Sequence, residues 1–377
     1  MSWTVVAAVE DALWAAAAKA RVPEAWLGGP GLSAAVVDRS RRYTSEREQL
    51  TAPPGEWGDL AARALFFTVA DAAKIQVPLA ELAMRAVDPV ARSIGGELRV
   101  LDLGAGCGAM SLGLVAHAAA HGSGALVIEL VDRDAKALAI AGDAIRGFAA
   151  AVGVTVRVSV RTADVTAPLG GPYGLIALGS VVNELSAATG LAVVKAAMKA
   201  ITPDGAVIVI DPALRTTARG LHAIRDALIT GGDATVFAPC TRRTAPCPML
   251  ADERDWCHEE RALELPPRAL RIAINTGLRD GAMKFAYLTL RRDPLPILDE
   301  PEALRIVGIG RKSKGKLEIP ACGAEGLVTL RLLHRHRYEG NRTIERARRG
   351  DLVTGIVGSD VTDETRVSRI TLGEDLT

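Results

Sequence analysis

The sequence predicts an α/β fold built around a mostly parallel sheet with helices on both faces. Between residues 98 and 292, short apolar runs rich in β-branched residues alternate with longer amphipathic stretches, and this alternation is typical of βαβ units. A glycine-rich turn follows the first of these runs. Of the 377 residues, 49% are hydrophobic and 24% are charged, which is ordinary for a globular protein and excludes general disorder.

An N-terminal helical region is expected over residues 1–92, because two stretches within it carry apolar residues at three-to-four spacing. Between them, residues 22–58 contain several Pro and Gly breakers and predict a loop-rich segment. This segment includes the basic run Arg39-Ser40-Arg41-Arg42-Tyr43. The first helix carries acidic residues and no basic leader, so it resembles neither a secretory signal nor a transit peptide.

The α/β domain is expected over residues 93–292. Its predicted strands form a seven-stranded sheet and lie at 98–104, 125–132, 155–162, 174–180, 206–211, 234–239 and 285–292. About residues 238–284 hold several prolines and three of the five cysteines, and predict a Cys-rich insertion with little regular structure.

A small, basic β module is expected over residues 293–377, with strands at 304–310, 316–320 and 327–338. The whole chain has a formal charge of only +1, yet residues 305–349 contain twelve Lys and Arg against four Glu. Such a basic segment favours a polyanionic partner, with nucleic acid first; the alternative is a solvated charged surface. No apolar run is long enough for a membrane span, and nothing indicates an oligomer.

The glycine-rich turn is the clearest ligand signal. Asp102 is followed by Gly104, Gly106 and Gly108, placed where a strand gives way to a helix whose N-terminal N–H groups are unpaired. The spacing also fits a dinucleotide fingerprint, G-x-G-x-x-A. A carboxylate at Asp102 suits a cationic ligand better than a pyrophosphate, which favours S-adenosylmethionine. A nicotinamide dinucleotide, or a tight turn without a ligand, are the alternatives.

The pattern D-x-G-x-G-x-G resembles motif I of class I S-adenosylmethionine-dependent methyltransferases, which have a Rossmann-like fold. The resemblance implies that Asp132 contacts the ribose hydroxyls and that Asp164 lies near the adenine amino group. Asn183 and Glu184 occupy the region of the catalytic motif in nucleic-acid methyltransferases, and are the catalytic candidates; alternatively they cap a helix. The quartet typical of adenine N6 enzymes is absent, and Cys240 is a further candidate, as a nucleophile.

The five cysteines do not indicate a disulfide framework, because their number is odd and no signal peptide is evident; a reducing compartment is expected. Cys240, Cys247 and Cys257 are separated by gaps of six and nine residues. These gaps lack the close pair typical of zinc sites and favour an iron–sulfur cubane. Cys322 or Cys107 would supply the fourth thiolate, with His258 as a possible substitute. A structural zinc ion and unliganded cysteines are the alternatives.

Four segments resemble a methyltransferase-like, Rsm-type family whose mitochondrial members help assemble the small ribosomal subunit: Ala238-Pro239-Cys240, Cys247-Pro248-Met249, Trp256-Cys257-His258 and Lys284-Phe285-Ala286-Tyr287-Leu288. The resemblance implies a 4Fe–4S cluster on Cys240, Cys247, Cys257 and Cys322, and binding to small-subunit rRNA. The chain departs from the family at Asp211-Pro212-Ala213, where Glu-Pro-Gly is usual, and at Thr241-Arg242-Arg243-Thr244, where a His is usual.

Two functions follow from these observations. The protein is an S-adenosylmethionine-dependent rRNA methyltransferase acting on the assembling small subunit, or it is a catalytically inactive assembly factor that grips rRNA with the same fold. We expect a cytoplasmic location, although the family also has mitochondrial members.

Overall fold

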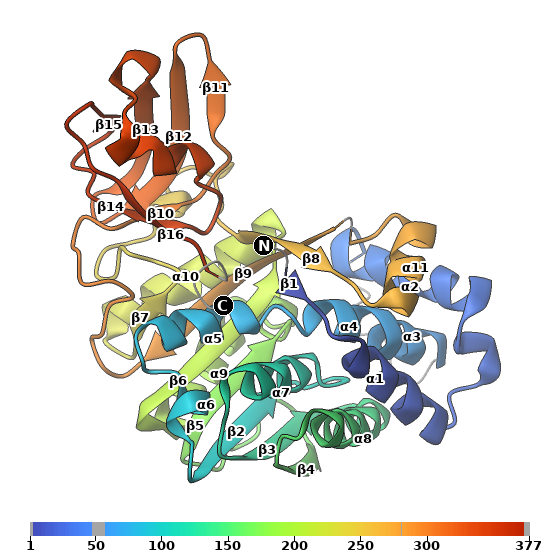
Figure 1. Ribbon diagram of the computed structural model, residues 1–377. Coiled ribbons are helices and arrows are strands. Elements are labelled where there is room, and N and C mark those ends of the chain that lie inside the picture. The colour runs from blue at the N-terminus through green and yellow to red at the C-terminus, as the bar shows by residue number, and fades with distance from the viewer. Residues whose placement is uncertain (1–2, 47–56, 280, 373–377) are drawn as a thin grey trace.

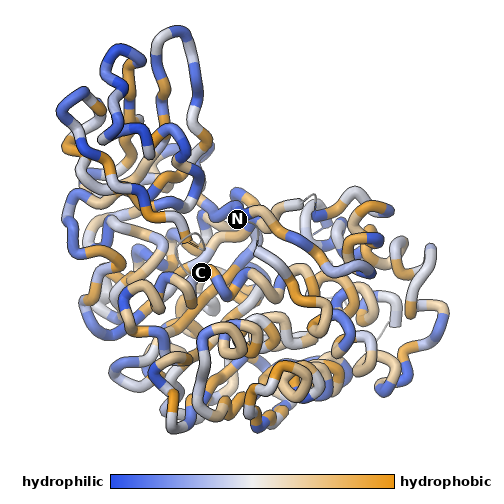
Figure 2. Tube along the Cα trace, in the orientation of Figure 1, coloured by the Kyte–Doolittle hydropathy of each residue, from blue (hydrophilic) through white to orange (hydrophobic). Residues whose placement is uncertain are grey.

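The computed structural model describes residues 3–46, 57–279 and 281–372. Figure 1 shows a large α/β body with a smaller β module, in orange and red, at one end. The body is built on a nine-stranded sheet and the module on a seven-stranded sheet. Hydrophobic residues are concentrated in the body, whereas the module is more hydrophilic, as Figure 2 shows.

All seven strands expected in the α/β domain are present. They are β2 (Glu97–Leu103), β3 (Ala125–Asp132), β4 (Val156–Thr162), β5 (Tyr173–Gly179), β6 (Ile201–Pro212), β7 (Thr235–Ala238) and β9 (Ala282–Arg291). Their order is β4-β3-β2-β5-β6-β9-β7, parallel from β4 to β6, with β9 antiparallel to both of its neighbours. The order reverses between β2 and β5, and ligands of open α/β sheets bind at such a switch point.

The predicted count of seven strands is wrong for the complete sheet. Two further strands, β8 (Glu259–Glu264) and β1 (Trp3–Thr4), extend it beyond β9. The sequence of β8 is mostly charged and β1 is only two residues long, so neither has the apolar run by which a strand is recognised.

Helices cover both faces of the sheet, as expected. On one face α7 (Ala109–His121) and α8 (Ala135–Val152) pack with the N-terminal α1 (Ala7–Lys19), and on the other lie α9 (Ala187–Ala200) and α10 (Arg215–Gly231). Each face has its own buried apolar core.

The expectation of a loop-rich segment at residues 22–58 is wrong in part. It contains the sixteen-residue helix α2 (Gly29–Thr44), because Pro30 lies at the start of the helix, where a missing N–H group costs nothing. Residues 47–56 of the segment lie outside the described residues. The remaining N-terminal elements are a 3-10 turn (Glu24–Trp26), α3 (Trp57–Ala62), a π-helical turn (Arg63–Phe67), α4 (Thr68–Asp71), α5 (Gln76–Met84) and α6 (Pro89–Arg92).

The Cys-rich insertion is more regular than expected. Residues 239–258 contain only the 3-10 turn Pro248–Leu250, but β8 and the helix α11 (Pro267–Thr276) follow. The carboxylate of buried Glu10 in α1 accepts the backbone N–H groups of Arg268, at 3.1 Å, and Ala269, at 2.6 Å. This contact from the far end of the chain satisfies unpaired N–H groups at the start of α11, and it cannot be read from the local sequence.

The C-terminal module is a separate sheet with its own small core. Its strands are β10 (Leu304–Ile306), β11 (Arg311–Ser313), β12 (Lys316–Gly323), β13 (Gly326–Leu333), β14 (Leu352–Thr354), β15 (Asp360–Val361) and β16 (Ser368–Ile370), with 3-10 turns at His334–His336 and Glu339–Arg346. The strand expected at 327–338 therefore ends at Leu333. Arg305 of β10 lies opposite Cys322 of β12 and forms a buried ion pair of 2.8 Å with Glu81 of α5, which joins the module to the body.

Candidate functional site

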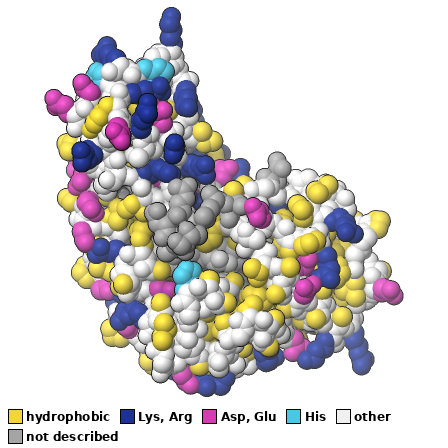
Figure 3. All heavy atoms as spheres, viewed as in Figure 1, with side chains coloured by type: hydrophobic (Ala, Val, Ile, Leu, Met, Phe, Trp, Pro, Cys, Tyr) yellow, Lys and Arg dark blue, Asp and Glu magenta, His cyan; other side chains and the backbone are white. Residues whose placement is uncertain are grey.

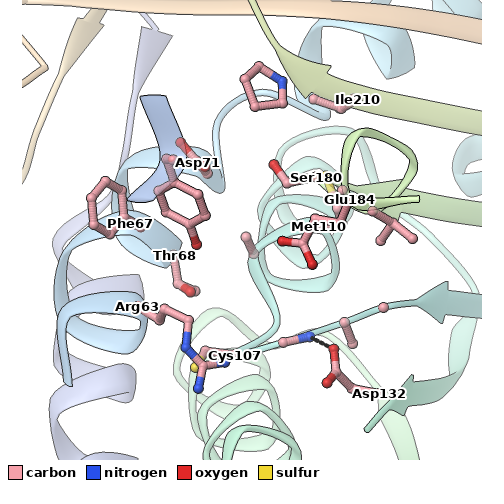
Figure 4. Close-up of a pocket in the computed structure, with 18 of the residues that line it drawn as sticks. Arg63, Phe67, Thr68, Asp71, Cys107, Met110, Asp132, Ser180, Glu184 and Ile210 are labelled. Carbon is pink, nitrogen blue, oxygen red and sulfur yellow. Dashed lines mark hydrogen bonds between the residues drawn. The ribbon is translucent and has the colours of Figure 1, made fainter. Parts of the chain in front are cut away.

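A cavity of about 560 Å³ opens at the carboxyl ends of the parallel strands, within the size range of small-molecule sites. The loops that follow β2, β3, β4, β5 and β6 line it on the side of the sheet, and α2, α3, α4 and the π-helical turn line it on the other. Figure 4 shows side chains from both walls converging on this space. The cavity lies at the switch between β2 and β5, the position expected for a ligand site.

The glycine loop has the backbone shape that requires glycine. Gly104, Gly106 and Gly108 all have positive φ angles, of 77°, 50° and 91°. A Cβ atom on Gly104 would lie 2.3 Å from Cγ2 of Val181. Gly104 and Gly106 line the cavity. Gly108 does not, because it precedes α7 and packs against Ala141 of α8.

Asp102 lies at the end of β2 and is 1% exposed. Its carboxylate accepts hydrogen bonds from Oγ of Ser111, at 2.6 Å, and from the Ser111 backbone N–H, at 3.2 Å. Burial raises the pKa of Asp102 to about 6; the two Ser111 hydrogen bonds oppose this rise and the nearby Asp132 carboxylate adds to it. A cation bound in the cavity would favour the ionised form of this carboxyl.

Asp132 is the last residue of β3, and Asp164 lies two residues after the end of β4. Oδ2 of Asp132 accepts the N–H of Gly106 at 2.8 Å and its Oδ1 accepts the N–H of Asp134 at 2.9 Å, so this side chain fixes the glycine loop against β3. Asp164 accepts the hydroxyl of Thr166 at 2.6 Å, and this bond holds the pKa of Asp164 below its usual value. With Asp102, Gly104 and Gly106, both acids line the cavity, so five of the six expected cofactor residues meet there.

The two catalytic candidates differ in position. Both lie in the 3-10 turn Val182–Glu184 that follows β5, but only Glu184 lines the cavity. Burial raises the pKa of Glu184, and the opposing effect of Arg39 does not cancel it. Neither residue caps α9, because Ser186 does so by accepting the N–H of Thr189 at 3.2 Å.

The helical wall of the cavity was missed from the sequence. Arg39 and Tyr43 project from α2, and Arg63 and Phe67 from the π-helical turn. Each pair is spaced by four residues, which places both members on one face of a helix. The four-residue spacing is the sequence signal for this wall, but it predicts a shared helix face only if residues 29–44 are known to be helical.

A largely buried ion-pair cluster adjoins this wall. The Asp71 carboxylate is 2.8 Å from Nζ of Lys74 and 2.8 Å from Nη2 of Arg279. Burial would raise the pKa of Asp71, but the two cations outweigh it and hold it below its usual value; burial lowers the pKa of Lys74. All three residues line the cavity. No sequence signal connects Arg279 with the other two, because it lies about two hundred residues away.

A second, smaller cavity gathers Cys240, Cys247, Cys257 and Cys322. The first three come from the insertion and the fourth from β12 of the module, and all are free thiols. Cys107 lines the large cavity instead, and the ring of His258 stacks against Trp256. Over residues 3–46, 57–279 and 281–372, no group of three or more His, Cys, Asp or Glu side chains is arranged to hold a single metal ion.

The small cavity holds buried, unpaired hydrogen-bond donors beside the four thiols. Burial and the neighbouring thiols raise the pKa of Cys247 to about 11 and of Cys322 to about 12, so these thiols stay protonated without a cation. The guanidinium groups of Arg225 and Arg305 line the cavity and are almost fully buried. Among the described residues, Nε of Arg225 and Nη2 of Arg305 have no hydrogen-bond acceptor. Four thiols with buried, unpaired N–H donors fit a thiolate-bound cluster of net negative charge.

Two of the solved structures to which the chain is similar are methyltransferases of low sequence identity. Magnesium protoporphyrin IX methyltransferase from Synechocystis PCC 6803, with bound S-adenosylmethionine, is 13% identical, with 69% of this chain and 97% of that chain covered and a TM-score of 0.34. An S-adenosylmethionine-dependent methyltransferase from Leishmania major is 15% identical, covers 73% and 89%, and has a TM-score of 0.36. Likenesses this remote say nothing about ligand or activity.

The family of the chain is established by its sequence. The search of curated proteins found no match to this chain. Among the described residues of the chain, no helix has the length and apolar character of a membrane span. The order and directions of the strands agree with the mostly parallel, Rossmann-like sheet expected from the sequence. The sequence profile described as "Mitochondrial small ribosomal subunit Rsm22" matches residues 74–354. This match spans well over half of the chain, and the protein therefore belongs to the Rsm22 family.

Proposed function

We propose that the protein binds S-adenosylmethionine in the large cavity and acts as a methyltransferase on the rRNA of the assembling small ribosomal subunit. The observation that carries the proposal is that Asp102, Asp132 and Asp164 line one cavity together with the glycine loop. Carboxylates complement the ammonium group and ribose hydroxyls of this cofactor, whereas the pyrophosphate of a dinucleotide would meet Asp102 with like charge.

Glu184 is the proposed proton acceptor. In methyl transfer, a lone pair on the acceptor atom forms a bond to the methyl carbon while the carbon–sulfur bond breaks, and the sulfonium becomes a neutral thioether. The acceptor then loses a proton. A buried carboxylate with a raised pKa at the cavity wall suits this task.

The four gathered cysteines are proposed to hold a 4Fe–4S cluster. Cys240, Cys247, Cys257 and Cys322 would be its ligands, and the cluster would fix the insertion to the C-terminal module, because such a site does not exist in the unfolded chain. A zinc ion in its place is the alternative. Free cysteines of this kind also favour a reducing compartment, such as the cytoplasm.

The C-terminal module is the proposed rRNA-binding surface. Figure 3 shows Lys and Arg side chains gathered over this module. Arg311, Lys312 and Lys314 are exposed on and beside β11, and no described acidic side chain forms an ion pair with them. Cations of this kind bind phosphates and release counterions.

The test is methyl transfer from cofactor carrying a tritiated methyl group to immature small subunits, with mature subunits as the control. We expect label in small-subunit rRNA, and its loss in Glu184→Gln. Binding of immature subunits without any transfer would instead favour the second candidate, a non-catalytic assembly factor, which the absence of an adenine N6 motif supports.

A further inference from the structure

Two arginines from different parts of the fold meet the four cysteines in the small cavity. Arg225 belongs to α10 in the body and Arg305 to β10 in the module, as Figure 1 shows. Arg225 is 1% exposed and Arg305 is 5% exposed. Buried Met249 and Val307 form part of the remaining wall. A group held by the thiols would therefore be enclosed by apolar side chains and by these two guanidinium groups.

The charges of both arginines are balanced within the protein. Nη1 of Arg225 is paired with the carboxylate of Asp226, and Nη1 of Arg305 lies 2.8 Å from the carboxylate of Glu81. Neither guanidinium needs an anionic ligand to balance its charge. What the two arginines offer to the cavity is therefore their hydrogen-bond donors.

Each arginine keeps one nitrogen whose N–H is not used inside the protein. The terminal nitrogens of Arg225 donate to backbone carbonyls of the insertion. Nε and Nη1 of Arg305 donate to the carbonyls of Pro239, at 2.9 Å, and Gly350, at 2.7 Å. Nε of Arg225 and Nη2 of Arg305 have no acceptor within the described parts of the chain. A buried donor without an acceptor is costly, so these two groups are suited to an acceptor bound in the cavity.

The sulfur atoms are the acceptors that lie beside these donors. The Arg225 guanidinium adjoins the side chain of Cys240, and Arg305 lies opposite Cys322 in the β10–β12 pair. The hydroxyl of Thr241, which also lines the cavity, already donates to the carbonyl of Cys322 at 3.1 Å. A protonated thiol is a weak acceptor, whereas an ionised sulfur accepts strong, charge-assisted hydrogen bonds. The two arginines therefore suit a group that holds the cysteines as thiolates.

We infer that Arg225 and Arg305 donate N–H hydrogen bonds to the sulfur atoms of the cluster and thereby raise its reduction potential. A 4Fe–4S cluster takes up one electron on reduction, and its sulfur atoms then carry more negative charge. Hydrogen bonds to these atoms stabilise the reduced form more than the oxidised form. This inference rests on the proposed cluster on the four cysteines.

The test is a potentiometric titration of the full chain, purified without oxygen and reduced stepwise with dithionite. The electron paramagnetic resonance signal of the reduced cluster gives the midpoint potential. Arg225→Lys and Arg305→Lys keep a positive charge beside Asp226 and Glu81 but remove the unpaired guanidinium N–H groups. At the wild-type midpoint, the ratio of reduced to oxidised cluster should be about tenfold lower in each variant, a shift of about 59 mV towards negative potential for one electron. The iron content should stay the same.

Arg219→Lys is the matched control, because it loosens the same insertion without changing the lining of the small cavity. Nη1 of Arg219, also on α10, donates to the carbonyls of Met249, at 2.6 Å, and Asp252, at 2.7 Å, but Arg219 does not line the small cavity. This variant should keep the wild-type midpoint. An equal shift in Arg219→Lys would mean that a looser insertion, and not the lost N–H groups, changes the potential, and would overturn the inference.

Exchangeable deuterons provide a second readout that does not depend on the midpoint. When the cluster is assembled in D₂O, pulsed electron paramagnetic resonance should detect deuterons coupled to the reduced cluster, and each cavity variant should lose part of this signal. Arg305→Lys tests the inference even where Arg225→Lys does not fold. Wild-type midpoints and deuteron signals in both variants would overturn the inference alone. A wild type without iron, or with stoichiometric zinc, would overturn the proposed cluster as well.

Discussion

Replacing Asp102 by Asn should stabilise the free protein and weaken its binding of cofactor. Asp102 is 1% exposed, and burial raises its pKa from the ordinary 3.8 to about 6. Each pKa unit corresponds to about 1.4 kcal/mol, so keeping this carboxylate ionised costs the folded state about 3 kcal/mol at pH 7. Asn can still accept the hydrogen bonds of Ser111 without that cost, and the free energy of unfolding should rise by up to about 3 kcal/mol.

The stability gain of Asp102→Asn should depend on pH in a defined direction. A carboxyl whose folded pKa is raised gives stability that is fully present below about pH 4 and is lost as pH rises to about 6. The advantage of Asp102→Asn should therefore be largest above pH 6 and should vanish near pH 4. Urea unfolding at several pH values measures it. At neutral pH, S-adenosylmethionine should bind the variant more weakly by about 1–3 kcal/mol, because the charged partner is lost.

Asp134→Asn is a control of opposite sign. Burial would raise the pKa of Asp134, but Arg63 and the N–H groups at the start of α8 hold it below its usual value. This variant should be less stable than the wild type at pH 7, with a difference that disappears in acid. An Asp102→Asn variant that is less stable than the wild type at pH 7, or whose advantage does not shrink between pH 6 and pH 4, would refute the reasoning.

Three further predictions concern the cysteines, the basic module and the junction between module and body. Cys322→Ser should lose iron from protein purified without oxygen, whereas the wild type should contain about four irons per chain; stoichiometric zinc would contradict the cluster. The double variant Lys312→Glu, Lys314→Glu should weaken rRNA binding whatever the RNA sequence and reduce the dependence of the affinity on salt, measured by filter binding. Unchanged binding would mean that the module does not contact rRNA. Glu81→Gln should lower the free energy of unfolding by about 3–5 kcal/mol, because it removes the negative charge that pairs with buried Arg305.

Each of these changes has a matched control. Cys107→Ser should keep its iron, because this cysteine lines the large cavity rather than the small one. Lys316→Glu should affect rRNA binding less, since Lys316 is already paired with Glu318 at 2.8 Å. Glu97→Gln breaks the exposed pair with Arg157 and should cost less than about 1 kcal/mol. If Glu97→Gln lost as much stability as Glu81→Gln, burial of the ion pair would not explain the larger effect expected for Glu81→Gln.

The parts of the site that lie on the sheet could be predicted from the sequence. Asp102, Asp132 and Asp164 lie at or just beyond the carboxyl ends of three parallel strands, and such ends meet at one edge of the sheet. The local sequence is enough to predict these positions, because the alternation of strands and helices and the glycine loop show where each strand ends. The seven strands of residues 93–292 were predictable for the same reason.

The helical wall could not be predicted, because it depends on contacts between distant segments. Arg39 belongs to a helix that begins at Gly29-Pro30, which reads as a break. Arg279 meets Asp71 only in the folded chain. Likewise, the polar sequence of β8 becomes a strand because it pairs with β9 on one side and with β1 on the other. Tertiary pairing of this kind overrides local propensity.

Equilibrium dialysis with radiolabelled S-adenosylmethionine measures whether the large cavity binds this cofactor. We expect one bound molecule per chain, displaced by S-adenosylhomocysteine and unaffected by NADH. No bound cofactor, or displacement by NADH in place of S-adenosylhomocysteine, would contradict the assignment of the cavity.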